Sequence, residues 1–295
     1  MSYVINQFIN GLQLGSIYAL VALGYSMVYG IILLLNFAHG DIIMVGAYTT
    51  FFAVTAFNLP PVVAVILTIL VCALLGVLIE KIAYSPLRNA PRLSLLITAI
   101  GISFLLEYTA QLEVVFGADT KSMVQNPLIP GSLQIGDMSI TYAAIFTIVV
   151  AVISMLILTF LVQKTKLGKA MRAVSEDMGA AQLMGISLNN TISFTFAVGS
   201  ALAGIGSVLH IASYYQADPM MGSMLGLKAF VAAVLGGIGS IPGAMIGGLV
   251  IGMVETLVTA LGLSVWKDGV VFAILIVVLL VKPTGLMGRT MTEKV

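Results

Sequence analysis

The stretch "PVVAVILTILVCALLGVLIE", residues 61–80, decides the fold class of this chain. Its first charged residue is Glu80, and the nearest charge on the other side is Asp41. A helix that crosses a lipid bilayer needs about 20 predominantly apolar residues. The stretch therefore predicts a transmembrane helix.

The same pattern of long apolar runs fills the rest of the chain. Hydrophobic residues make up 60% of the 295 residues and charged residues only 8%, against roughly half and about a quarter in soluble domains. Together with the charges and the Pro/Gly punctuation, the apolar runs predict further spans near 8–34, 37–57, 94–116, 141–163 and 191–214. We therefore expect an all-α, polytopic integral membrane protein that forms a single transmembrane domain over residues 1–295.

The C-terminal part, residues 228–282, is less regular. It divides into a short apolar piece that reaches Gly239, a second run that ends at Leu263, and a third run over 269–281. The first piece is too short to cross a bilayer alone, so a half-helix, a re-entrant segment and part of a tilted helix all remain open. The chain is expected to have about eight transmembrane helices, either eight or nine.

Basic residues predict the orientation of these helices. Cytoplasmic loops of membrane proteins carry an excess of Lys and Arg. Three places collect such residues, and they are expected on the cytoplasmic side: Lys81, Arg88 and Arg92; Lys164, Lys166, Lys169 and Arg172; Lys282, Arg289 and Lys294. The N-terminus is then external. It has no basic n-region of a secretory signal, which predicts that the first membrane helix itself targets the chain.

Several classes of function are disfavoured by what the sequence lacks. A net charge of +1 argues against a nucleic-acid partner. The chain contains no G-x-x-x-x-G-K-[ST] phosphate loop and no H-E-x-x-H or G-x-S-x-G motif, and His39 and His210 are far apart. Cys72 is the single cysteine, so no disulfide framework or cysteine-based metal site is expected. We expect no catalytic residues, no metal site and no cofactor in this chain.

The segment "GKAMRAVSEDMGAAQLMGI", residues 168–186, is an unusually polar insert. Ser175 is expected as the N-cap of a short helix, Glu176 and Asp177 in its first turn, and Gly185 as its C-terminal stop. This helix would present a small apolar surface formed by Met178, Ala181, Leu183 and Met184. It suits insertion into a groove on a partner protein, or a position on lipid headgroups, and the pattern alone favours neither.

Polar residues also occur within the predicted membrane region. The stretch "NFAHGDII", residues 36–43, contains Asn36, His39 and Asp41, and intramembrane polar groups often mark a substrate path. Gly40 would allow a helix break whose exposed backbone could bind the two charged groups of a zwitterion. The alternative is a structural turn at the cytoplasmic membrane face, which the predicted topology favours.

Two intramembrane acids, Glu107 and Glu255, are further candidates for the substrate pathway. Glu107 and Glu113 are six residues apart, so on one helix they point about 120° apart and form no paired site. Glu113 is expected near the outer surface. Glu107 and Glu255 lie deeper, where they would either serve transport or form structural ion pairs.

Glycines are spaced for close helix packing in two parts of the chain. The G-x-x-x-G spacing lets two helix backbones approach each other. It occurs at Gly11 and Gly15, at Gly239 and Gly243, at Gly243 and Gly247, and at Gly248 and Gly252. The simple interpretation of these pairs is helix–helix packing.

Four stretches resemble one known family, the LivH-like branched-chain amino-acid permeases of ATP-binding-cassette importers. The polar insert is similar to the cytoplasmic coupling loop of that family. The other stretches are "GLQLGSIYALVALGYSMVYGIILLLNFAHGD" at 11–41, "LKAFVAAVLGGIGSIPGAMIGG" at 227–248 and "LLVKPTGLMGR" at 279–289. The resemblance therefore covers essentially the whole chain.

The resemblance implies a division of labour. The chain would be a non-catalytic, multi-pass subunit of the bacterial cytoplasmic (inner) membrane that forms half of a path for Leu, Ile or Val. Its partners would be a second homologous permease, two cytoplasmic ATPases that bind ATP and Mg, an extracytoplasmic amino-acid-binding protein, and membrane lipid. Residues 164–190 would be the cytoplasmic coupling loop.

Within this loop, the residues expected to contact the ATPase are Arg172, Ser175, Glu176, Asp177, Ala181, Met184 and Gly185. The residues expected along the substrate pathway are Asn36, His39, Asp41, Glu107 and Glu255.

Two other functions stay open on the sequence. The first is a urea or short-chain amide importer. It stays open because related permeases carry those substrates and no single side chain in this sequence identifies the substrate. An ion-coupled secondary transporter or channel would use a deep carboxylate such as Glu107 or Glu255 and would need no ATPase.

Overall fold

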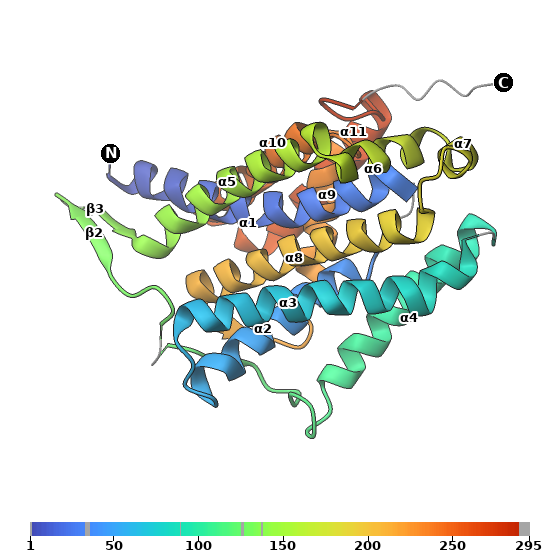
Figure 1. The fold of residues 1–295 in the computed structure, drawn as a ribbon. Coiled ribbons are helices and arrows are strands. Elements are labelled where there is room, and N and C mark those ends of the chain that lie inside the picture. Colours follow the sequence, from blue (N-terminus) through green and yellow to red (C-terminus); the bar gives the residue numbers. More distant parts are fainter. Residues whose placement is uncertain (1, 33–35, 89, 125–126, 137, 289–295) are drawn as a thin grey trace.

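The computed structural model describes residues 2–32, 36–88, 90–124, 127–136 and 138–288. These residues form a bundle of helices with a few short strands at its periphery (Figure 1). Arg289 and Lys294, two members of the predicted C-terminal basic group, lie outside the described residues.

The helices account for almost all of the fold. The bundle contains α1 (Ser2–Ile32), α2 (His39–Thr55), α3 (Pro61–Ile79), α4 (Arg92–Ala110), α5 (Tyr142–Lys164), α8 (Leu188–Tyr214), α9 (Met221–Gly236), α10 (Ile241–Ala260) and α11 (Lys267–Val281). Two short helices, α6 (Lys166–Glu176) and α7 (Met178–Leu183), lie between α5 and α8. Among the described residues, seven helices are long and apolar enough to cross a membrane, and α9 is a shorter apolar helix. The predicted all-α polytopic fold is confirmed.

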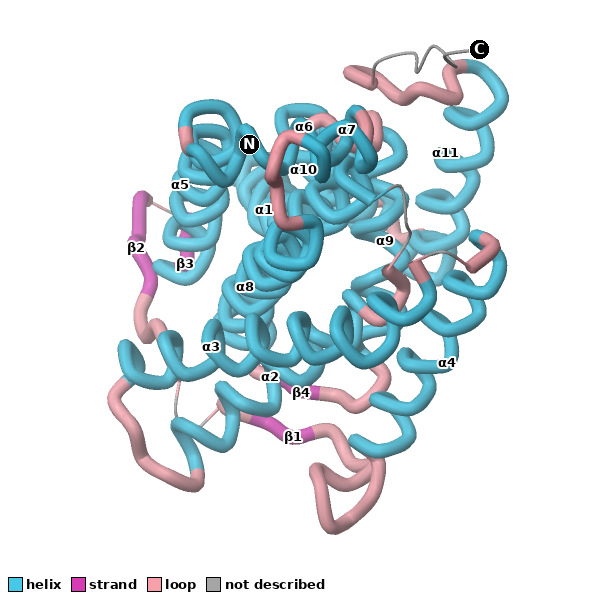
Figure 2. The backbone as a smooth tube through the Cα atoms, turned by 45° about the vertical axis from the view of Figure 1, so that its right-hand side comes forward, coloured by secondary structure: helices cyan, strands magenta, loops and turns pink. Residues whose placement is uncertain are grey.

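The remaining elements are short. A π-helical turn, Glu80–Tyr84, and a 3-10 turn, Ser85–Leu87, follow α3, and another 3-10 turn, Ser264–Trp266, precedes α11. The strands form two antiparallel pairs: β2 (Ser132–Ile135) with β3 (Met138–Thr141), and β1 (Lys121–Ser122) with β4 (Gln216–Ala217). Figure 2 shows the second pair beneath α2, where it ties the α4–α5 connection to the end of α8.

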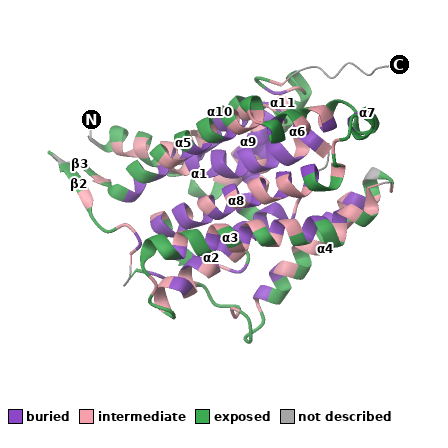
Figure 3. Ribbon diagram, viewed as in Figure 1, coloured by how far each residue is buried: buried purple, intermediate pink, exposed green. Residues whose placement is uncertain are grey.

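Helix α1 is the central helix of the bundle, and most of its middle part is buried (Figure 3). It packs closely against α10 through the glycines of both helices. A Cβ atom added to Gly252 would collide with the backbone of Gly15, and one added to Gly248 would collide with the backbone of Ala19. The interpretation of these G-x-x-x-G pairs as helix-packing sites is confirmed.

The segments predicted to be cytoplasmic gather at one end of the bundle. In Figure 1 the α3–α4 connection, the α6–α7 pair and the segment after α11 all lie at the right-hand end, which we call the basic end. The N-terminus and the β2–β3 hairpin lie at the opposite end. This arrangement agrees with the prediction that the three basic segments lie on one side of the membrane and the N-terminus on the other. The assignment of the basic end to the cytoplasm stays a prediction.

The structure resolves the irregular C-terminal part into three helices, α9, α10 and α11. Helix α9 begins at Met221, so Lys228 lies inside this helix and does not mark its start. The chain then turns at Gly237 and Gly239, whose φ angles are +105° and +89°, and continues antiparallel as α10. The division at Lys228 was wrong because acidic partners neutralise this charge within the bundle.

The start of α2 differs from the expected turn at the cytoplasmic membrane face. A Cβ atom added to Gly24, in the interior of α1, would lie 2.5 Å from Nε2 of His39 and 2.9 Å from the carbonyl oxygen of Gly199 on α8. Helix α2 therefore begins inside the bundle, opposite the interior of two long helices. The break also precedes His39, whereas Gly40 lies within α2 and packs on the backbone of Gly222.

Candidate functional site

The polar insert folds as two helices with a sharp break. Helix α6 is capped by Thr165, whose hydroxyl oxygen accepts from the Gly168 N–H at 3.0 Å. Asp177 has an extended backbone, and its Oδ1 accepts from the Ala180 N–H at 2.9 Å. The prediction of one helix capped by Ser175 is therefore wrong, because the Asp177 carboxylate caps α7 instead. The Ser175 hydroxyl donates to the carbonyl oxygen of Arg172 at 2.8 Å.

The predicted contact residues differ in their accessibility. Arg172 is exposed, and it donates to the carbonyl oxygen of Val162 at 2.6 Å and so ties α6 to α5. Ala181 is only 4% exposed and faces the chain itself. Gly185, with φ of +82°, ends α7 as predicted.

The insert carries an exposed apolar tip at the end of α7. Leu183 and Met184 are 90% and 83% exposed, and Glu176 and Asp177 are exposed on the approach to them. Figure 3 shows α7 as an exposed element at the basic end. Leu183 belonged to the predicted apolar surface but not to the predicted contact residues. We call Leu183 and Met184 the α7 tip.

Four of the five predicted pathway residues surround the starts of α2 and α9. Asn36 accepts a hydrogen bond from the Tyr84 hydroxyl at 2.8 Å, and the ring of His39 packs edge-on against Tyr25 with centroids 4.7 Å apart. Asp41 of α2 is fully buried and its Oδ1 lies next to Gly222. Glu107 of α4 accepts from the hydroxyl of Ser223, the next residue on α9. Helices α2 and α4 therefore bring Asp41 and Glu107 to the same turn of α9.

This first group contains polar atoms without hydrogen-bond partners. Among the described residues, both carboxylate oxygens of Asp41, Nε2 of His39 and Nδ2 of Asn36 are buried and unpaired. Leaving such groups unpaired in an apolar interior costs free energy. Their arrangement can accept a ligand, an ion or water at the broken helix.

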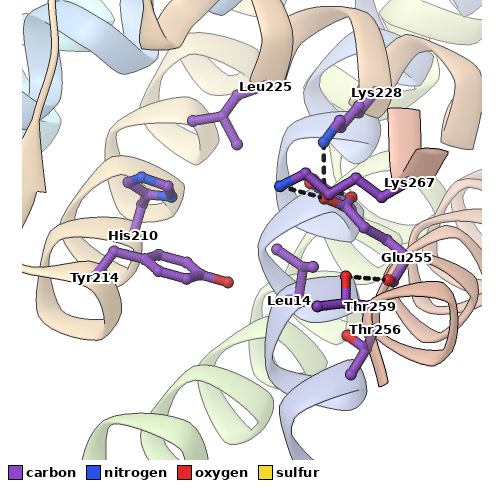
Figure 4. Close-up of a pocket in the computed structure, with 10 residues that line it drawn as sticks. Leu14, His210, Tyr214, Leu225, Lys228, Glu255, Thr256, Thr259 and Lys267 are labelled. Atoms are coloured by element: carbon purple, nitrogen blue, oxygen red, sulfur yellow. Dashed lines mark hydrogen bonds and ion pairs between the residues drawn. The ribbon is translucent and has the colours of Figure 1, made fainter. Parts of the chain in front are cut away.

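Glu255, the fifth predicted pathway residue, lies in a second group made by other helices. Its Oε1 receives the Lys228 ammonium at 2.8 Å and its Oε2 receives the Tyr18 hydroxyl at 2.7 Å. Lys228 also pairs with Asp268 at 2.6 Å, and the Lys267 ammonium is 3.5 Å from Glu255 Oε1. Figure 4 shows Lys228 and Lys267 converging on Glu255. We call Lys228, Glu255, Lys267 and Asp268 the charged cluster.

Three members of this cluster were not among the predicted site residues. Lys228 stood at the boundary of the irregular C-terminal part, and Lys267 and Asp268 fell between its second and third apolar runs. The sequence did carry one signal, a single lysine and a single glutamate in successive apolar runs, residues 221–236 and 241–260. Two such charges can share one membrane interior only if they face each other or water.

A third polar group connects the end of α3 to the start of α8 at the basic end. Glu80 is buried, forms an ion pair with Arg88 and accepts from the Ser193 hydroxyl at 2.6 Å. Arg88 also donates to Asn189. This Glu80 clamp fastens the end of α3 to the first turns of α8, the helix that follows α7.

A multi-pass helical bundle with polar groups in its interior and an exposed helical pair at one end is typical of membrane transport proteins. Comparison with known families gives the particular family. The profile described as "Branched-chain amino acid transport system / permease component" matches residues 7–279, so the chain belongs to this family.

Individual relatives extend over almost the whole chain. It is 43% identical to the high-affinity branched-chain amino acid transport system permease protein BraD of Pseudomonas aeruginosa, over 99% of this chain and 98% of that one. It is 42% identical to the corresponding permease protein LivH of Escherichia coli, over the same shares of both chains. A probable branched-chain amino acid transport permease of Methanocaldococcus jannaschii is 30% identical over 91% of this chain and 88% of its own. No solved structure matches the chain.

Proposed function

We propose that this chain is the membrane-spanning permease subunit of an ATP-binding-cassette importer for leucine, isoleucine and valine. The observation that carries the proposal is the sequence identity of 42–43% over nearly full length to permease proteins of high-affinity branched-chain amino acid transport systems. The chain is non-catalytic, lies in the bacterial cytoplasmic membrane and forms half of the translocation path beside a second homologous permease. An extracytoplasmic binding protein delivers the substrate.

The α7 tip is proposed to be the contact with a cytoplasmic ATPase, which holds ATP and Mg. Support comes from the exposure of Leu183 and Met184 beyond the bundle, at the end where the basic loops gather. Burying one leucine side chain contributes about 1.5–3 kcal/mol of free energy. Two such side chains in a groove of the ATPase would therefore keep the two subunits in contact while the ATPase moves. The exposed acids Glu176 and Asp177 would add charged contacts at the rim of that groove.

The Glu80 clamp would transmit movement of this contact into the bundle. Helix α7 leads directly into α8, and the clamp joins the start of α8 to the end of α3. A rigid-body shift of the ATPase would therefore move both helices together. The buried group at the start of α2, with Asp41 and Glu107, is proposed to line the path along which the substrate moves.

A substitution at the α7 tip tests the proposal directly. In Leu183→Glu a charge replaces the apolar contact, and we expect leucine uptake into cells to fall to background while the protein stays in the membrane. The ATPase subunits should no longer co-purify with the variant. The control is Leu286→Glu, at a half-exposed leucine of the basic end outside the α7 tip, which should keep both uptake and the ATPases.

Two results would contradict the proposal. Normal uptake and normal co-purification in Leu183→Glu would show that the α7 tip is not the coupling contact. A wild-type chain that purifies alone and moves leucine on an ion gradient would instead establish an ion-coupled transporter. If leucine-loaded binding protein stimulates ATP hydrolysis by the purified complex, the importer and its substrate class are both supported.

A further inference from the structure

A cavity of about 360 Å³ lies beside the charged cluster, between α1, α8, α9 and α10 (Figure 4). Pockets for small molecules range from about 300 to about 1,000 Å³, so this cavity is at the lower end and suits a small ligand. It lies toward the end of the bundle opposite the basic end. The Tyr3 hydroxyl near the N-terminus donates to the carbonyl oxygen of Ala260, the last residue of α10, little more than one turn beyond Glu255.

The walls of the cavity are chemically different. One wall carries the charged groups of Lys228, Glu255 and Lys267, and Leu14 and Leu225 add apolar surface. Across the space from Glu255, Figure 4 shows the Tyr214 ring with its hydroxyl pointing into the cavity. The site thus offers positive charge, negative charge and aliphatic surface within one small volume.

The charges of the cluster balance one another within the chain. Two ammonium groups and two carboxylates pair with one another at 2.6–3.5 Å. Removing such charges from water costs free energy, and their mutual attraction seldom exceeds this cost. A buried ion pair is therefore weak evidence that the charged residues stabilise the fold. In addition, Nδ1 of His210, which lines the cavity, is buried without a hydrogen-bond partner among the described residues.

We propose that this cavity binds the substrate itself, a free branched aliphatic α-amino acid, as its zwitterion. The substrate carboxylate would replace the carboxylates now bound to Lys228 and Lys267, and its ammonium group would pair with Glu255. The aliphatic side chain would lie against Leu14 and Leu225. A zwitterion exchanges one positive and one negative partner with the cluster, so the site stays neutral when it is filled. The inference rests on the proposed function and assigns this chain its own subsite.

Protection of an introduced cysteine tests the proposal in the assembled importer. The natural Cys72 is fully buried, so a small thiosulfonate reagent should react first with Thr256→Cys, which replaces a residue of the cavity wall. Leucine at ten times its Kd should slow this labelling about tenfold, as mass action requires. Leucinamide and 4-methylpentanoate each lack one of the two charges and should give little protection. Val265→Cys, an exposed site outside the cavity, should be labelled at the same rate with and without leucine.

Second substitutions in the Thr256→Cys chain then test the named residues. Leu225→Trp fills the cavity and Glu255→Gln removes the ammonium partner but keeps an acceptor for Tyr18, so both should abolish protection by leucine. Met224→Trp, at an exposed residue of the same helix, should preserve it. Unchanged protection in both cavity variants, or equal protection by 4-methylpentanoate and leucine, would overturn the zwitterion site while leucine-stimulated ATP hydrolysis still supports the importer. If leucine did not stimulate ATP hydrolysis by the wild-type complex, the proposed function itself would be overturned.

Discussion

The α7 tip and the charged cluster distribute polarity in opposite ways. At the tip, Leu183 and Met184 project from the bundle although they are apolar. In the cluster, Lys228 and Glu255 are almost completely buried although they are charged. Each arrangement costs free energy in the isolated chain, because exposed apolar surface and buried charge are both unfavourable.

The difference indicates two kinds of partner. An apolar tip matches a groove on another protein, where water leaves both surfaces. A balanced set of buried charges beside a small cavity matches a small molecule that carries both signs. The two regions also lie toward opposite ends of the bundle, since the tip is at the basic end and α10 ends near the N-terminus. The permease would therefore meet its substrate and its energy source at different ends.

The largest expected effect comes from breaking the charged cluster. Lys228→Met leaves the Glu255 carboxylate buried without its closest cation, which should cost about 3–5 kcal/mol of folding free energy. The double variant Lys228→Met/Glu255→Gln removes both charges and should recover most of this loss, yet it should not recover leucine protection in the cavity. Thermal unfolding of the purified complex measures the first effect. A single variant as stable as the wild type would show that the pair contributes no coupling energy.

The Glu80 clamp, which connects the α7–α8 junction to the bundle, should have the next largest effect. Arg88→Met removes a charged hydrogen-bond donor from the buried Glu80, and hydrogen bonds to charged groups contribute about 1.5–3 kcal/mol. We expect lower thermal stability and weaker stimulation of ATP hydrolysis by leucine. Lys81→Met removes an exposed positive charge from the same loop and is the control that should change neither. Equal stability of the two variants would argue against the clamp.

The cap of α7 should have a smaller and local effect. Asp177→Ala removes the acceptor for the Ala180 N–H, and loss of such a cap costs about 1 kcal/mol. The expected result is faster amide hydrogen exchange over residues 178–184, with little change in the rest of the chain. Asp177→Asn keeps an accepting oxygen and should exchange almost as slowly as the wild type. Glu176→Gln removes the neighbouring charge without touching the cap, so a loss of uptake in this variant would point to contact with the ATPase.

The sequence predicted those parts of the fold that depend on a single kind of interaction. Long apolar runs predicted the helical membrane fold, and the glycine spacing predicted close helix packing at the positions where α1 and α10 meet, because a short stretch of residues is enough to show apolar burial or close backbone approach. The caps of α6 and α7 were harder. Ser175 and Asp177 are both good capping residues, and only the three-dimensional break between the helices distinguishes them.

The candidate sites depended on pairings that a single sequence does not display. A charge within an apolar run predicts a loop unless its partner is known, and Lys228 finds its partners on α10 and at the start of α11. Likewise, the place of Asp41 inside the bundle follows from the packing of Gly24 against His39 and of Gly40 against Gly222. Both errors arose because the position of each polar residue was inferred only from its neighbours along the chain.

The smallest effect on stability is expected at the α7 tip, where the effect on function should be large. Surface substitutions away from caps and packed contacts usually change stability by less than about 0.5 kcal/mol, and Leu183 is 90% exposed. Leu183→Glu should therefore unfold at the temperature of the wild type while it loses leucine uptake. The cluster variant Lys228→Met/Glu255→Gln should also lose uptake, but it should retain the ATPases that Leu183→Glu releases. If Leu183→Glu lowered the unfolding temperature as much as Arg88→Met, the tip would be part of the chain's own packing, because only a contact within the folded chain could account for such a loss.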